Sequence, residues 1–320
     1  TTTKLRGTVL AYLGDAFGEN ADDLNNTALQ YRAILNFNTS FTGKDQLIIG
    51  LQSFNFRRFN AGAEFPGGRL SGPGTTDETR FAPVGFTGNN ELRLFALQYS
   101  FPLADNLRVT LNAFSRERTV SERVTPFSNT AIGPISYYGR INPMIYPIGS
   151  QTGIDVLWKP RPWLDLAFSA ASELGSSENP TTGLFKGGYL GSARSLISLG
   201  DLKLIAAYIH SYSPDQGIDS LSGSNAAKVR ALMPDNTDNY APVSANTYVG
   251  GFFYEFSPKF EVGGSVAYSD ARTIAEGVRG DATVLDYRAN LIFYDLGKKG
   301  NLAGFIFGIQ PRLTGTSTEQ

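Results

Sequence analysis

The sequence predicts an all-β fold, a transmembrane antiparallel β-barrel, and three observations support this. About thirteen segments alternate apolar and polar residues, as strands do when one face meets lipid and the other water. Short turns alternate with long polar connections, the pattern of periplasmic turns and extracellular loops. Aromatic rings flank most of the short turns, for example Trp158 and Trp163 around residues 159–162. Amphipathic rings favour the membrane–water interface, so these rings indicate one edge of a bilayer.

Composition narrows the function classes. The 320 residues include 28 basic and 29 acidic side chains, so the net charge of −1 gives no reason to expect a nucleic-acid partner. No run of about 18 apolar residues exists, which excludes a membrane-spanning helix. The absence of cysteine excludes disulfides and thiolate metal sites. We expect no cofactor.

The strands are expected in order along the chain. Their ranges are 4–13, 29–38, 46–54, 92–101, 107–114, 153–158, 163–172, 189–199, 202–210, 247–256, 260–269, 283–293 and 302–309. In the first, Leu5, Val9 and Leu13 share one face. In the fourth, Leu92 and Leu94 are out of phase with the apolar residues that follow, which predicts a bulge.

Long connections are expected at residues 14–26, 55–90, 115–150, 173–188, 211–245 and 270–282, all on one side of the sheet. Thirteen strands is an odd number, whereas bacterial single-chain barrels close with an even one. The last residues, 316–320, do not read as a strand. We therefore expect one barrel domain over 1–320 whose last strands are absent from this sequence.

Charged residues in the polar phases are expected to face a water-filled lumen. The pore-lining candidates are Arg32, Arg108, Arg116, Arg194, Arg288, Asp155 and Asp286. Arg6, Arg93, Lys203, Asp165 and Glu261 share these phases, so eight basic residues face four acidic ones. A basic wall favours anions. The alternative is that these charges only solvate the lumen.

The third long connection is predicted to fold inward and narrow the channel. Its apolar residues, such as Ile135 and Tyr137, would be poorly placed in free solvent. A surface loop or a trimer contact is the alternative. The candidate constriction residues are Glu117, Arg118, Glu122, Arg123, Tyr138 and Arg140.

Other motifs are weaker. Asp15, Glu19, Asp22 and Asp23 could attract cations at a pore mouth, although a solvated acidic loop is the simpler interpretation, because clusters of one charge sign are common on loops. Oxygen-bearing side chains at residues 235–239 could bind Ca²⁺ but match no calcium-loop spacing, so the sequence assigns no metal site. His210 and Ser211 are adjacent in a strand and point to opposite faces, so they cannot form a nucleophile–base pair. We expect no enzymatic activity.

Three short motifs resemble cyanobacterial outer-membrane porins, the iron uptake porins related to carbohydrate-selective (OprB-type) porins. They are TTTKLRG at residues 1–7, YGRINP at 138–143 and NLAGF at 301–305. The resemblance implies a 16-stranded, homotrimeric barrel for passive diffusion of small ions and solutes across an outer membrane. It also implies an N-terminal S-layer-homology domain that binds peptidoglycan, outside this chain. Carbohydrate uptake, and a purely structural anchor between membrane and peptidoglycan, are the alternatives.

Overall fold

The computed structural model describes residues 1–15, 26–55, 90–115, 133–140, 152–173, 183–218, 222–233 and 236–317. Among these residues, no helix is long and apolar enough to cross a bilayer.

Thirteen strands form one antiparallel sheet, and each pairs with its neighbours in chain order. The strands are β1 (Thr2–Gly14), β2 (Ala28–Ser40), β3 (Gln46–Phe54), β4 (Arg93–Ala104), β5 (Leu107–Phe114), β6 (Thr152–Arg161), β7 (Leu164–Ser172), β8 (Tyr189–Leu199), β9 (Leu202–Ser213), β12 (Val243–Ser257), β13 (Phe260–Thr273), β14 (Gly280–Tyr294) and β15 (Leu302–Thr316). This confirms the predicted fold class and the thirteen expected strands.

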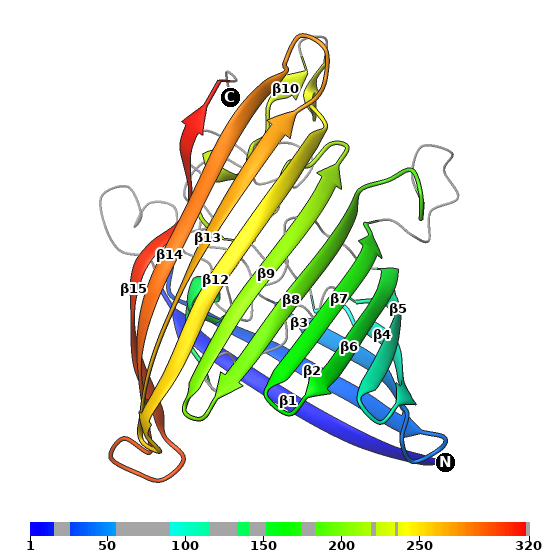
Figure 1. Ribbon diagram of the computed structural model, residues 1–320, viewed down its shortest axis with the longest axis vertical. Helices are drawn as coiled ribbons and strands as arrows, with labels where there is room; N and C mark the ends of the chain where they lie inside the picture. The colour runs from blue at the N-terminus through cyan, green and yellow to red at the C-terminus, as the bar shows by residue number, and fades with distance from the viewer. Residues whose placement is uncertain are drawn as a thin grey trace.

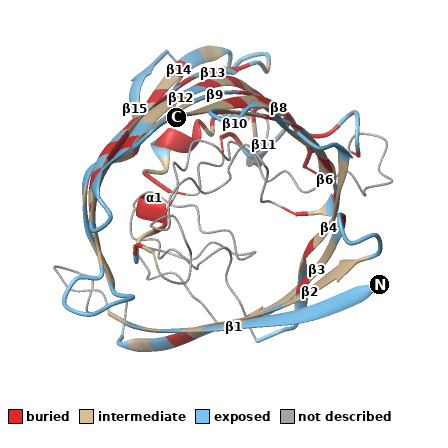
Figure 2. Cartoon of the chain, turned by 60° about the horizontal axis from the view of Figure 1, so that its bottom comes forward, coloured by how far each residue is buried: buried red, intermediate tan, exposed pale blue. Residues whose placement is uncertain are grey.

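The sheet curls around a central space, with β1 and β15 as its first and last strands (Figures 1 and 2). Within the described residues, β1 pairs only with β2, and β15 pairs only with β14. In the described sheet, β1 and β15 are therefore the two edge strands and are not paired with each other.

The outer face carries two rows of rings at different heights. A turn-side girdle consists of Trp158, Trp163, Phe256, Phe260, Phe293 and Phe305, several in ring-to-ring contact. A loop-side girdle consists of Tyr208, Tyr248, Tyr268 and Tyr287.

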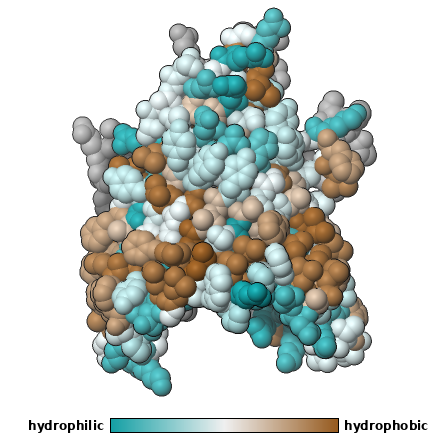
Figure 3. Space-filling model, viewed as in Figure 1, coloured by the Kyte–Doolittle hydropathy of each residue, from teal (hydrophilic) through white to brown (hydrophobic). Residues whose placement is uncertain are grey.

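The girdles are separated by about the thickness of an apolar membrane layer. On β12, Tyr248 and Phe256 are eight residues apart. At about 3.3 Å per residue and a tilt of about 40°, that separation is roughly 20 Å in height, close to the ~25 Å apolar band of membrane barrels. Figure 3 shows hydrophobic residues gathered in a band across the lower half of this face, with more hydrophilic residues above it. The outer surface therefore matches a bilayer.

The bulge predicted in the fourth strand is present. The pairing of β3 with β4 shifts register between Gly50 and Leu51, where Ala96 and Leu94 are the successive partners. Phe95, the extra residue, places its ring over Gly50, where a Cβ atom would lie 2.7 Å from that ring. The glycine therefore makes room for an inward-facing phenylalanine.

One short turn is held by a single carboxylate. Asp45 Oδ1 accepts hydrogen bonds from the Thr42 backbone N–H (2.8 Å), the Thr42 hydroxyl (2.7 Å) and the Ser40 hydroxyl (2.8 Å). The Tyr99 hydroxyl donates to Oδ2 at 3.0 Å. These donors, led by the Thr42 backbone, lower the pKa of Asp45 below its ordinary value of 3.8. The turn is thus stabilised by an ionised side chain.

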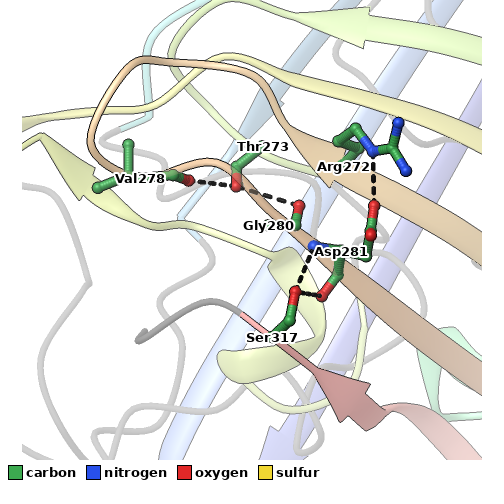
Figure 4. A network of polar contacts seen from close by, with 6 residues as sticks. All are labelled: Arg272, Thr273, Val278, Gly280, Asp281 and Ser317. Atoms are coloured by element: carbon green, nitrogen blue, oxygen red, sulfur yellow. Dashed lines mark hydrogen bonds and ion pairs between the residues drawn. The ribbon is translucent and has the colours of Figure 1, made fainter.

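The last strands are longer than the early ones. Strands β12 to β15 have 14 or 15 residues, whereas β3, β5 and β7 have 8 or 9. Their loop-side ends are tied together, as Figure 4 shows: Arg272 pairs with Asp281, and the Asp281 N–H donates to the Ser317 hydroxyl at 2.8 Å. Thr273 also donates to the Gly280 carbonyl at 3.3 Å. These ties hold the rim of the long strands beyond the loop-side girdle.

In the part of the chain that the structure describes, a helix, a 3-10 turn and a hairpin lie outside the main sheet, and none of them was predicted. They are the short helix α1 (Tyr137–Arg140), the 3-10 turn η4 (Ala226–Lys228) and a hairpin of β10 (Leu232–Met233) with β11 (Asn236–Tyr240). Figure 2 shows α1 and β10 inside the ring of strands. Both long connections that contain these elements therefore place residues in the interior.

Candidate channel interior

The inner faces of β2 to β6 carry long polar side chains. Gln98 Nε2 donates to Asn112 Oδ1 at 2.6 Å, and Asn112 Nδ2 donates to Asp155 Oδ2 at 2.6 Å. The three residues come from β4, β5 and β6, so the chain of hydrogen bonds crosses three strands. We call β2–β6 the polar wall.

Two predicted arginines belong to the polar wall and are half-buried. Arg32 on β2 donates through Nη2 to Gln52 Oε1 at 2.6 Å and lies over the Phe95 ring, 5.9 Å from its centroid. Arg108 on β5 donates to the Ser100 hydroxyl at 3.2 Å and to the Lys44 carbonyl at 3.1 Å. These contacts fix both guanidinium groups on the wall.

Three other charged residues of the inner face have polar partners. Arg93 forms an ion pair of 2.7 Å with Glu91, and Asp165 forms one of 3.0 Å with Lys159. Glu261 Oε2 accepts a hydrogen bond of 3.3 Å from the Tyr294 hydroxyl. The predicted inward position of Asp165 therefore brings it to Lys159, which the sequence reading did not single out.

The opposite half of the interior is built from small and apolar side chains. A buried cluster combines wall residues of β7–β9 and β12–β14 with Ile218, Ala227 and Val229 of the fifth long connection. The wall members are Ala171, Leu190, Ala207, Ile209, Val243, Ala245, Val249, Ala267, Ala271, Ala282 and Val284. Small wall residues leave room, so the connection packs closely against the sheet. We call residues 216–218 and 222–231 the fifth-loop segment.

The third long connection reaches the same half of the interior at α1. Arg288 on β14 donates to the Tyr138 carbonyl, and its guanidinium carbon lies 5.9 Å from the centre of the Tyr138 ring. Tyr137, Tyr138 and Arg140 are buried. Tyr137 is buried, as expected for an apolar side chain poorly placed in solvent, whereas Ile135 of the same connection is 67 % exposed, contrary to that expectation.

Four of the predicted pore-lining charges are covered rather than open to the interior. Asp286 and Arg288 lie beside α1, and their residues are 0 % and 7 % exposed. Asp155 and Arg194 are 1 % and 4 % exposed. A role in lining the channel stays a prediction for all four, and the half-buried Arg32 and Arg108 are better placed for it.

The other predicted site residues have less to show. Asp15 accepts a hydrogen bond from the Thr27 hydroxyl. Arg116, Glu117, Arg118, Glu122, Arg123, Glu19, Asp22 and Asp23 lie outside the described residues. The described part of the chain holds no cluster of three or more His, Cys, Asp or Glu side chains that could bind a metal ion.

The uncharged members of the polar wall were not among the predicted site residues. Gln52, Gln98 and Asn112 lie in the polar phases of their strands, so the same alternation that selected Arg108 could have selected them.

His210 Nδ1 is 3.0 Å from Asn246 Oδ1 on the outer face. Asn246 Oδ1 can only accept, so the histidine donates.

Two cyanobacterial proteins are similar to the chain, and no protein-family model matches it. An uncharacterised protein of Nostoc sp. (strain PCC 7120) is 31 % identical over 332 residues, which cover 98 % of this chain and 56 % of the relative. An uncharacterised protein of Synechocystis sp. (strain PCC 6803) is 28 % identical, covering 99 % of this chain and 59 % of the relative. The chain thus spans somewhat more than half the length of these relatives.

Two solved structures share the general shape at low similarity. OmpT of Vibrio cholerae, described as outer-membrane expressed, has a TM-score of 0.46 at 9 % identity and covers 98 % of this chain and 76 % of its own. OprB of Pseudomonas putida has a TM-score of 0.45 at 13 % identity, with coverages of 98 % and 93 %. At such low scores these likenesses carry no inference about function. What the comparisons add is that the chain has relatives in cyanobacteria.

Proposed function

We propose that the chain forms a passive, non-enzymatic outer-membrane channel through which small ions and solutes diffuse along the polar wall. The observation that carries this proposal is the contrast between the two faces of the sheet. Outward side chains form an apolar band between two aromatic girdles, while the inward side chains of β2–β6 form a hydrogen-bonded polar surface. A sheet with lipid on one side and water on the other is the requirement for an aqueous pore.

The channel prefers anions weakly. Arg32 donates to Gln52, and Arg108 donates to the Ser100 hydroxyl and the Lys44 carbonyl, so both guanidinium groups are held on the polar wall. Fixed positive charge beside a water-filled path lowers the electrostatic cost of anion entry. The acidic first connection, with Asp15, Glu19, Asp22 and Asp23, would act at the mouth and favour cations such as iron or other metal ions.

The third connection narrows the channel. The contacts of α1 with β14 support an inward path for residues 133–140, and the predicted constriction charges Glu117, Arg118, Glu122 and Arg123 belong to the same connection. Segments inside a barrel reduce the width of its lumen, so conductance depends on where this connection rests. Lipid surrounds the barrel, and a homotrimer is the expected assembly.

Planar-bilayer recording of the full-length protein in a salt gradient tests the proposal. We expect discrete ohmic steps with a reversal potential on the anion-selective side. Arg32→Gln and Arg108→Gln should each move that potential toward cation selectivity. Arg272→Gln is the matched control, because Arg272 pairs with Asp281 at the rim beyond the loop-side girdle, away from the polar wall.

The same recording separates the alternatives. Block of the current by saccharides would favour a carbohydrate-selective porin. A correctly inserted protein without conductance would contradict the channel and favour a structural anchor between outer membrane and peptidoglycan. A reversal potential unaffected by both arginine substitutions would contradict the assignment of selectivity to the polar wall.

A further inference from the structure

The last strand contains a bulge at the height of α1. On β15, Ile309 pairs with Tyr287 and Arg312 pairs with Leu285, so Gln310 and Pro311 together face the single residue Asp286. Proline has no N–H to give to the sheet, and bulges are among the few positions in a sheet that tolerate it. The register shift thus leaves backbone carbonyl groups accessible from inside the barrel.

The third connection is bonded to this bulge through Tyr138. The Tyr138 hydroxyl donates to the carbonyl of Tyr287 and lies 3.1 Å from that of Ile309, the pair immediately before the bulge. Two glycines make the approach close: a Cβ atom on Gly308 would collide with the Tyr138 hydroxyl and with the Tyr287 carbonyl. A Cβ atom on Gly139 would collide with Ile306.

The fifth-loop segment is bonded to the next two residues of β15, Gln310 and Pro311. The Ser222 hydroxyl donates to Gln310 Oε1, and the Ser224 N–H donates to the Pro311 carbonyl at 3.2 Å. Gly223 lies between them with a φ of +92°, and a Cβ atom there would collide with Pro311. Two connections far apart in sequence are therefore seated within four residues of β15.

We propose that the bulge at residues 308–311 is a shared seat, in which Tyr138 and Ser222 are positioning residues that couple the two inward connections. Each connection fixes the backbone shape that the other one binds. Release of either one then loosens the other, because coupling between two sites is reciprocal. The inference rests on the proposed channel for its effect on conductance, but the coupling itself does not depend on conduction.

A thiol reporter measures the coupling directly. The chain has no cysteine, so Ala227→Cys introduces a single thiol at a position that is 0 % exposed within the fifth-loop segment. Its rate of labelling by a polar maleimide, in the folded full-length protein, reports how often this segment leaves the wall.

Tyr138→Phe is then added in the other connection, removing one hydroxyl and little volume. We expect labelling of Cys at position 227 to rise about fivefold, the change that loss of one hydrogen bond produces. Tyr294→Phe is the matched control, since it also removes one tyrosine hydroxyl, on the strand β14 that accepts the Tyr138 hydrogen bond but at a site away from the bulge. The labelling rate of this control should stay within about twofold of the parent, which corresponds to less than half of the free energy of one hydrogen bond.

Single-channel conductance gives the second readout. Ser222→Ala and Tyr138→Phe should each raise the mean conductance, and the double variant should add little to either, since one seat is already lost. Labelling of Cys at position 227 that ignores Tyr138→Phe would overturn the shared seat, even if the protein conducts. Labelling that responds in a protein without conductance would keep the seat and overturn the channel.

Discussion

The two halves of the barrel have the same kind of apolar outer face but differ in the side chains of their inner faces. The polar wall presents half-buried arginine and glutamine side chains bonded to one another across strands. Strands β7–β9 and β12–β14 present alanine, serine and valine, covered by the fifth-loop segment and α1. Lipid imposes one requirement on the whole exterior, whereas each part of the interior is free to fit what it meets. One half of the interior therefore carries polar side chains suited to contact with water, and the other half carries small side chains against which the loops pack.

Val229→Asp should have the largest effect, by releasing the fifth-loop segment from the wall of β7–β9 and β12–β14. Val229 is 1 % exposed in the buried cluster, and a carboxylate there has no partner, so we expect the segment to lose more than about 4 kcal/mol of packing free energy. Protease cleavage within residues 211–245 should accelerate while the barrel stays folded. Leu232→Asp is the control, because Leu232 is 50 % exposed in the same connection. Equal cleavage of both variants would contradict the buried cluster.

Leu204→Arg should test the shared exterior. Leu204 pairs with Phe252, midway between the two girdles, and points outward. An arginine at the bilayer midplane costs about 2–4 kcal/mol, and one near an interface about 0–1. Ser244→Arg, beyond the loop-side girdle on β12, supplies the second case. Unfolding by denaturant in lipid vesicles measures both, and a Leu204→Arg variant as stable as Ser244→Arg would contradict the membrane position.

Asn112→Ala should weaken the polar wall by a smaller amount. Asn112 is buried and bonds both Gln98 and Asp155, so its loss leaves two polar groups without this partner and costs about 1–3 kcal/mol. Asn38→Ala is the matched substitution: Asn38 accepts a hydrogen bond from an exposed Gln46 side chain, which water can replace, and donates a long one of 3.3 Å to the Asn36 carbonyl. In thermal unfolding in detergent, the midpoint should be lower for Asn112→Ala than for Asn38→Ala. Equal midpoints would show that the hydrogen bonds of Asn112 add no stability.

Acidification should produce the smallest effect, confined to the turn at Asp45. Its folded-state pKa lies below 3.8, so the stabilisation is complete above that pH and is lost as the pH falls through the folded value. Hydrogen exchange of the turn amides at about pH 6 and about pH 2.5 measures this. Asp45→Asn should remove the difference, whereas Asp105→Asn in the next short turn should keep it. A difference that persists in Asp45→Asn would assign it to another group.

Much of the sheet could be predicted because alternation is a local signal. Thirteen strands and the bulge near Phe95 follow from which residues are in phase, and so does the inward face of Arg32 and Arg108. The fifth-loop segment could not be found in this way. Ile218, Ala227 and Val229 have no strand period, and the wall that they cover is assembled from six different strands.

The candidate site was predictable only in part for the same reason. The sequence places Arg288 and Asp286 on the inner face, but their burial depends on α1, which comes from residues about 150 positions away. Tyr138 was predicted as a constriction residue because it lies in the third long connection among apolar residues. Its hydrogen bond to the bulge between β14 and β15 could not be predicted, because it depends on the pairing register of two strands.

The contacts of Tyr138 and Ser222 with residues 308–311 matter for anyone who would re-engineer this barrel. Surface connections in such proteins are natural places for grafts and shortened variants, because neighbouring ones rarely depend on each other. Here a replacement of either one removes a donor from a backbone that the other one also uses. The two would have to be redesigned as a pair, together with the short stretch of β15 that receives them both.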